Sequence, residues 1–322
     1  MGNVSGICSK PAPKFIEEQV SLYESADLDR LTMKFDEITQ NPSIADLENE
    51  FGPFQFEYNY YIEIERGFNR VECNYEDNNQ VMRYISEGPL LGKDEKGTWI
   101  YIGECLINSK VRDGRGYLVY IEEKSKFQGY FKDDKINGRG RLCSPEKILE
   151  GDWYDGRLYG EGKEKSRDKS SYKGSYKDGL YDGLGKSEHS DGSEYSGEFL
   201  RGERHGYGEY NWNDGSVYQG DWREGKFHGI GKYTDSMGNI YEGGWKDNRM
   251  NGYGEYAWAD GRKYRGNYVD DKKHGYGEFY WPDGQVCRGN WINGKQHGKG
   301  EYRNNGNNKV GTWHHGVFVS WD

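Results

Sequence analysis

Seven histidines are the side chains of this sequence best suited to bind a metal ion. Four of them precede a Gly-x-Gly unit, at spacings that are multiples of 23 residues: His205, His228, His274 and His297. If 23 residues span two neighbouring β-strands, successive histidines lie ~9–10 Å apart, whereas a zinc ligand lies only ~2 Å from its metal. We therefore expect these four histidines to stabilise turns. The adjacent pair His314 and His315 could bind a metal weakly, but we assign it to a solvated end, so the sequence predicts no metal site.

The Gly-x-Gly units are the residues that could bind phosphate. A nucleotide site needs such a unit before a helix that carries a lysine or an acidic partner, and none of these units has that context. Because the units recur every 23 residues, we assign ten of their glycines to structural turns: Gly206, Gly208, Gly229, Gly231, Gly252, Gly254, Gly275, Gly277, Gly298 and Gly300. No Gly-x-Ser-x-Gly, His-Glu-x-x-His or kinase motif is present. We predict a protein that is not an enzyme and holds no cofactor.

The N-terminal sequence MGNVSG could carry a lipid. Gly2 stands where N-myristoylation needs a glycine, and Cys8 is close enough for palmitoylation. Gly6 replaces the Ser or Thr of the motif, so an unmodified terminus is the alternative. Because one myristoyl chain anchors a protein only marginally, stable attachment would need Cys8, or Lys10 and Lys14, as a second signal.

The composition excludes several classes of protein. The 322 residues include 48 Gly, 28 Tyr and 10 Trp, but only 7 Pro. No run of about 20 apolar residues could span a membrane, and the scarcity of proline excludes collagen. An aromatic content of 16% argues against a disordered chain, and the long Val/Ile/Leu strands of an α/β enzyme are missing. What remains is a β-rich chain whose apolar surface is mostly aromatic.

The charge of the chain belongs to its N-terminal third. Lys+Arg number 44 and Asp+Glu 54, which gives a net charge of −10. Residues 1–94 hold 8 basic and 18 acidic residues, so residues 95–322 hold 36 of each and are neutral. A nucleic-acid-binding domain is normally basic, and we therefore predict no nucleic-acid partner.

The cysteines indicate the compartment. Five of them stand at scattered positions without a Cys-x-x-Cys pair, which fits neither a disulfide framework nor a zinc site. No apolar secretory segment begins the chain. We expect a cytoplasmic protein.

An internal repeat organises residues 95–322. Each copy begins with an aromatic or apolar anchor that is followed by any residue and a glycine. The anchors are Tyr101, Phe127, Leu149, Tyr172, Tyr195, Tyr218, Tyr241, Tyr264 and Cys287, with a truncated last copy at Val310. From Leu149 to Cys287 the anchors stand 23 residues apart. Most anchors are followed, four residues later, by a second aromatic residue. A polar or glycine turn and the Gly-x-Gly unit come next. This order predicts one β-hairpin per copy.

Stacked hairpins predict an elongated ladder. With strands ~4.8 Å apart, nine copies would extend about 85–90 Å, and each copy would contact only its neighbours. We expect pairs such as Asp214-Gly215 to supply positive-φ turn positions. Glycines within the strands would leave room for aromatic rings to lie flat over the backbone.

Residues 218–233, YQGDWREGKFHGIGKY, resemble the MORN repeat at every diagnostic position. The resemblance covers residues 97–316 and recurs in register. It implies a mainly β fold, an elongated single-layer antiparallel sheet of hairpins. It also implies a non-catalytic role in organising membranes or cytoskeleton, without an appended catalytic domain. The first three copies depart from the pattern, and we expect them to pack against the N-terminal region.

Three regions follow from these patterns: a flexible terminus over 1–14, an acidic helical and mixed region over 15–94 that caps the ladder, and the MORN ladder over 95–322. Hydrophobic spacing predicts a helix over 15–40, closed by Pro42, and a short helix over 45–51.

This helix pair superficially resembles an EF-hand. We expect no calcium, because Pro42 replaces the required glycine and the early Asp ligands are missing. The aromatic runs at 54–64 and 68–85 predict strands that cover the first edge of the ladder.

The residues themselves predict an extended, repeat-built scaffold that binds a protein partner, and the resemblance implies its place in a cytoskeletal assembly, either a ciliary axoneme or the cell cortex. The partner would be a helix along the concave face, or a second copy end to end, with membrane contact through the N-terminus. Large rigid rings suit protein recognition, and the expected contact residues are Tyr210, Trp212, Trp222, Trp245, Tyr256, Trp258, Phe279, Tyr280 and Trp281. The alternative is that at least half of these rings pack over strand glycines.

A second function stays open, a phosphoinositide-binding membrane-junction module. Lys272-Lys273 is the best basic pair for it. The neutral charge of residues 95–322 argues against strong affinity for anionic lipid.

Overall fold

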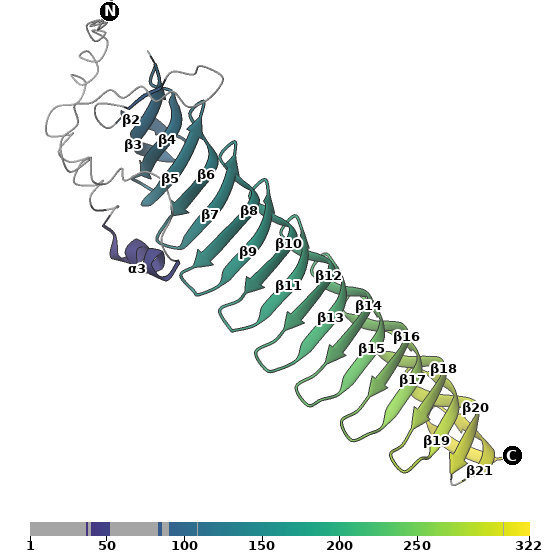
Figure 1. Ribbon diagram of the computed structural model, residues 1–322. Coiled ribbons are helices and arrows are strands. Elements are labelled where there is room, and N and C mark those ends of the chain that lie inside the picture. The colour runs from purple at the N-terminus through teal and green to yellow at the C-terminus, as the bar shows by residue number, and fades with distance from the viewer. Residues whose placement is uncertain (1–36, 38–39, 52–82, 86–89, 108, 305) are drawn as a thin grey trace, which may run out of the picture.

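The computed structural model describes residues 37, 40–51, 83–85, 90–107, 109–304 and 306–322. In these residues one open antiparallel sheet of 22 strands forms an elongated ladder, with the helix α3 (Pro42–Phe51) at its N-terminal end (Figure 1). The strands are β1 (Arg83–Ile85), β2 (Leu90–Asp94), β3 (Gly97–Leu106), β4 (Arg112–Tyr120), β5 (Ser125–Lys132), β6 (Lys135–Cys143), β7 (Lys147–Tyr154), β8 (Arg157–Ser166), β9 (Ser171–Lys177), β10 (Leu180–Glu188), β11 (Glu194–Leu200), β12 (Glu203–Asn211), β13 (Val217–Arg223), β14 (Lys226–Thr234), β15 (Ile240–Lys246), β16 (Arg249–Ala257), β17 (Lys263–Val269), β18 (Lys272–Tyr280), β19 (Val286–Ile292), β20 (Lys295–Asn304), β21 (Asn307–His314) and β22 (Val317–Trp321).

From β3 onward every strand pairs with the next strand of the chain, so the sheet is a meander of hairpins. β1 and β2 both pair with β3, on the edge that β4 leaves free. This arrangement confirms the predicted fold class, a single-layer ladder of antiparallel hairpins.

Two kinds of turn alternate along the ladder. The tight turn between β13 and β14 places Glu224 at φ 51° and Gly225 at φ 72°, which is the backbone of a two-residue hairpin turn. The longer turn after β12 holds Gly215 at φ 87°, and the Asp214 carboxylate accepts a hydrogen bond from the Ser216 N–H at 2.8 Å. The predicted positive-φ turn position at Asp214-Gly215 is therefore confirmed.

One row of glycines crosses the whole sheet. In the ladder's register Gly208 faces Gly220, Gly220 faces Gly231 and Gly231 faces Gly243, and such pairs run without a break from Gly103 to Gly311. A Cβ in this row would collide with the ring of an anchor tyrosine or with the facing backbone. The row exists because the rings need this space.

The assignment of the ten Gly-x-Gly glycines to turns was wrong, because all ten lie inside strands. The first glycine of each unit has a positive φ, as at Gly229 with 58°, and stands where the register shifts by a bulge. The second glycine, such as Gly231, belongs to the row beneath the rings. The bulge frees the Ile230 N–H, which donates to the Asp221 carboxylate at 2.8 Å.

The helix α3 packs on the N-terminal part of the ladder. Ile44 and Leu47 form a buried cluster with Cys143 and Ile148 of β6 and β7. Lys126 donates to the Glu48 carboxylate at 2.7 Å. The second predicted helix is confirmed but begins at Pro42, a residue that suits the first helical position.

Pro42–Glu48 is helical, so it does not form the second half of an EF-hand loop. The predicted helix over 15–40 lies almost entirely outside the described residues, as do Gly2, Cys8 and the aromatic run 54–64.

Candidate functional site

The anchor side chains build a continuous aromatic core on one face of the ladder, which we call the inner face. Tyr218 is fully buried, and its hydroxyl donates to the Asp221 carbonyl oxygen at 2.9 Å. Trp222, four residues later, meets the Tyr218 ring edge-on at a centroid distance of 5.2 Å and donates from Nε1 to the Gly208 carbonyl oxygen at 3.1 Å. Equivalent residues extend this core from Tyr101 to Trp291.

The nine predicted contact residues divide into three groups. Tyr210, Trp222, Trp245 and Phe279 are core side chains with 3–8% exposure, so their assignment as contact residues was wrong. They are buried because neighbouring copies stack ring against ring. The half-buried rings of the inner face, which pack against the core and keep some surface, are Trp212, Tyr256, Trp258 and Trp281.

Tyr280 lies on the opposite, outer face. Its neighbour Phe279 belongs to the inner core, and successive residues of a strand point to opposite faces. The Tyr280 hydroxyl interacts with the Glu278 carboxylate, and the Arg265 guanidinium lies 5.7 Å from its ring centroid.

A second row of side chains covers the anchor tyrosines, and its residue type varies from copy to copy. Tyr181 stacks on Tyr172 at a centroid distance of 3.6 Å. Phe227 stacks on Tyr218 at 3.7 Å in the same way. This row is not evident in the sequence because its members share no residue type, although each of these residues stands just before a His/Asn/Asp-Gly-x-Gly unit.

Three members of this covering row are cations: Arg112, which pairs with the Asp134 carboxylate at 3.2 Å, and Arg204 and Lys273, which have no such partner among the described residues. The Lys273 Nζ lies 4.7–4.9 Å from the centroids of four rings, those of Trp258, Tyr264, Phe279 and Trp291. Burial, with a smaller contribution from the Arg262 charge, lowers the pKa of Lys273 from 10.5 to about 8. Aromatic faces attract a cation but do not neutralise it.

Arg204 is the other covering-row cation that has no ion pair among the described residues. Its guanidinium lies 4.6 Å from the Trp222 ring and 4.8 Å from the Tyr210 ring. Its hydrogen bond to the Gly225 carbonyl oxygen is long, at 3.4 Å. Within the described part of the chain no carboxylate forms an ion pair with Arg204 or Lys273.

The charges of the outer face, in contrast, pair with one another across strands. Arg288 contacts the Glu278 carboxylate at 2.9 Å, and Arg265 pairs with Glu255. The prediction that Lys272 and Lys273 form one basic pair was wrong. Adjacent strand residues face opposite sides, so Lys272 is exposed while Lys273 is enclosed by rings.

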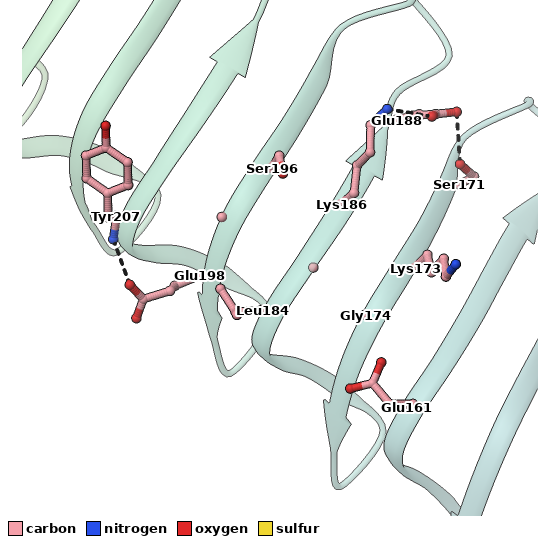
Figure 2. A pocket seen from close by; sticks show the side chains of 12 residues that line it. Glu161, Ser171, Lys173, Gly174, Leu184, Lys186, Glu188, Ser196, Glu198 and Tyr207 are labelled. Carbon is pink, nitrogen blue, oxygen red and sulfur yellow. Dashed lines mark hydrogen bonds and ion pairs between the residues drawn. The ribbon is translucent and has the colours of Figure 1, made fainter.

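The outer face also carries a row of exposed apolar residues at the central position of the Gly-x-Gly units: Leu184, Tyr207, Ile230, Tyr253 and Tyr276. Between Leu184 and Tyr207 lies an open hollow of ≈ 740 Å³, lined largely by Lys173, Lys186, Ser196 and Glu198 (Figure 2). Lys186 is paired there with Glu188 at 3.2 Å. The hollow brings together no arrangement of a nucleophile and a base.

No helix within the described residues is long and apolar enough to cross a membrane.

Comparison with solved structures finds distant likenesses. The TCP domain of SAS-4 from Drosophila melanogaster, in complex with a proline-rich motif of Ana2, is 11% identical with a TM-score of 0.29, over 46% of this chain and 82% of that one. The G-box domain of the microcephaly protein CPAP is 10% identical with a TM-score of 0.26, over 67% and 99%. Scores this low carry no functional argument. No curated protein matches the sequence.

Comparison with protein families is decisive. The family model of the MORN repeat, a non-catalytic repeat module, matches residues 127–146, 150–171, 172–194, 195–217, 218–240, 241–261, 264–286 and 287–308. The structure adds a further copy before these, in which Tyr101 donates to the Glu104 carbonyl oxygen at 2.7 Å and covers Gly116. This chain belongs to the MORN-repeat family.

Proposed function

We propose that this protein is a non-enzymatic scaffold whose inner face binds an acidic segment of a protein partner. The observation that carries the proposal is the pair of cations, Arg204 and Lys273, that lie among aromatic rings without a carboxylate partner in the described residues. A desolvated cation next to rings weakens the fold unless an anion pairs with it. A carboxylate of a partner would supply that pairing.

The spacing of the two cations restricts the partner. Arg204 and Lys273 occupy the same position in copies three repeats apart, so six strand steps of ~4.8 Å place them about 29 Å from each other. A helix covers this length in about 19 residues, and an extended segment in about nine. The half-buried Trp212 and Trp258 line the same face beside the two cations.

Membership of the MORN family also supports a place in a cytoskeletal assembly, and we extend this proposal to a ciliary axoneme or the cell cortex. End-to-end association of two copies has its own support. Phe318 and Trp321 of the last strand, β22, are 42% and 45% exposed, and β21 is the strand that pairs with β22 among the described residues. An exposed apolar strand of this kind favours pairing with another strand.

The phosphoinositide alternative has less support. Arg265 and Arg288 of the outer face are paired with glutamates, so their charges are already balanced by carboxylates of the same sheet. Binding of the intact protein to vesicles that contain phosphoinositide, and no binding to vesicles of neutral lipid, would favour this alternative.

Two full-length variants test the scaffold proposal in ciliated cells. Arg204→Met together with Lys273→Met removes both cations, and methionine already stands in the covering row at Met250. Lys272→Met is the control, because it removes an adjacent charge from the outer face. We expect the double variant to leave the detergent-resistant cytoskeletal fraction while wild type and control stay. Equal retention of all three proteins would contradict the proposal.

A further inference from the structure

Three imidazoles meet at the C-terminal end of the ladder. His297 belongs to β20, His314 ends β21, and His315 begins the turn to β22. One ligand nitrogen of each can be chosen so that all three lie within 4.8 Å of one another. The ring centroids of His297 and His315 are 4.7 Å apart, and those of His314 and His315 4.6 Å. Within the described residues this is the one cluster of three or more metal-ligating side chains.

We propose that His297, His314 and His315 form a binding site for a divalent transition-metal ion of the zinc class. Imidazole suits Zn²⁺, Ni²⁺ and Cu²⁺, and three histidines leave the fourth position of a tetrahedral zinc open. Zinc–nitrogen bonds of about 2.0–2.1 Å require the three nitrogens to approach slightly from their present separation. His314 and His315 are exposed, so small side-chain rotations can bring them closer.

The backbone holds the three rings together without a metal. In a regular strand, consecutive residues such as His314 and His315 would point to opposite faces. The turn to β22 prevents this, because the chain reverses at His315, with φ 47°, and Gly316, with φ 84°. The His315 N–H donates to Nδ1 of His297 at 3.4 Å. This weak bond would be exchanged for the metal bond if Nδ1 is the ligand atom, and Nε2 is the alternative ligand.

The position of His297 recurs in other copies, but the cluster does not. His274 stands at the same place in the preceding copy, where the next hairpin offers Ile292 and Asn293 instead of two histidines. Asn293 has the φ of His315, at 53° against 47°. Among the described copies, the last hairpin is the one that adds two imidazoles, those of His314 and His315, to the histidine of the preceding strand. The regular spacing of the other histidines could therefore not reveal the site.

A bound metal would join β20 to the last hairpin. The open coordination position would then accept water, or a ligand from a second protein molecule. Lys295 lies beside this turn, close to Gly316, so its positive charge opposes metal binding.

Isothermal titration with ZnCl₂ or NiCl₂ tests the site, on full-length protein purified without a polyhistidine tag. The variants are His297→Asn and His315→Asn, because asparagine already stands at these positions in other copies, as Asn251 and Asn293. His274→Asn is the matched control. We expect one metal ion per chain for wild type and control, and binding at least about tenfold weaker for each of the other two variants.

Absorption spectra of the Co²⁺ complex identify the ligands. Visible bands of tetrahedral cobalt without thiolate charge transfer are expected for three imidazoles, and thermal unfolding shows whether each variant is folded. No binding by wild type, an equal loss in the His274→Asn control, or thiolate bands in the cobalt spectrum would each overturn the proposal.

Discussion

The ring of Tyr218 fills the space that a side chain at Gly231 would need. A Cβ at Gly231 would lie 2.4 Å from the Tyr218 hydroxyl oxygen and 2.6 Å from the ring carbon that bears it. Tyr218 and Gly231 lie on the paired strands β13 and β14, where Gly231 is opposite Gly220, two residues after Tyr218. Ring and glycine therefore form one unit, and the ladder repeats this unit from copy to copy.

Gly231→Ala should lower the free energy of unfolding by about 1–3 kcal/mol, as expected for a crowded core. The Tyr218 ring must move, and its hydrogen bond to the Asp221 carbonyl oxygen would be strained. Urea unfolding measured by tryptophan fluorescence checks this. Gly294→Asn is the control, because Gly294 lies in open space at φ 82° and Asn248 already occupies such a turn position. Equal losses in both variants would show that the ring is not the cause.

Lys273→Met should stabilise the protein at neutral pH while it weakens partner binding. The folded protein has a Lys273 pKa of about 8, against an ordinary value of 10.5. Between these pH values the unfolded chain binds more protons, so the stability of wild type rises with pH across this window. Thermal unfolding from pH 7 to pH 10.5 should show this rise for wild type and a smaller one for the variant. Identical pH profiles would rule out a desolvated lysine.

Ile44→Ala should release α3 from the ladder and expose the Cys143 thiol. Ile44 is fully buried, and its loss costs about 2–5 kcal/mol. Burial, reinforced by the nearby Glu48 carboxylate, raises the pKa of Cys143 to about 12 in the folded protein, where the thiol is unreactive. We expect modification by a thiol reagent to become at least about tenfold faster. Cys287, buried elsewhere in the ladder, should react at an unchanged rate and serves as the internal control.

Gly2→Ala should move the protein from the membrane fraction to the soluble fraction, because alanine cannot be myristoylated. Ser9→Ala is the control, since it changes the same terminus outside the six-residue motif and leaves both Gly2 and Cys8 in place. Metabolic labelling with a myristate analogue measures the lipidation, and cell fractionation measures the attachment to membranes. Label on the Gly2→Ala protein, or no label on wild type, would refute lipidation of Gly2.

The sequence predicted the architecture well because the fold repeats itself. A glycine stands two residues after each of the nine anchors, and an aromatic residue four residues after all of them but Tyr101, because one steric need recurs in every copy. The hairpin turns depend on local residues such as Gly215. Alternation places Gly229-x-Gly231-x-Tyr233 in a strand, whereas the regular recurrence of the unit favours a turn, since a Gly-x-Gly unit looks the same in a turn and at a bulge. Only the pairing of β13 with β14 distinguishes the two.

The candidate site was predicted less well, for two reasons. Alternation assigns Trp222 and Trp258 to one face, but the depth of each ring depends on what the next copy places over it. The covering row has no common residue type, so Arg204 and Lys273 look like ordinary surface cations in the sequence. The histidine cluster combines residues from two hairpins, and the spacing within one copy does not show it.

Photo-crosslinking in cells measures most directly which face binds the partner. A photoreactive phenylalanine replaces either Tyr256, a half-buried ring of the inner face, or Tyr253, an exposed ring three residues earlier on the outer face. We predict a crosslinked protein from position 256 whose attached peptide is acidic, and loss of this adduct when Lys273→Met is added. Adducts that form from position 253 alone would contradict binding at the inner face.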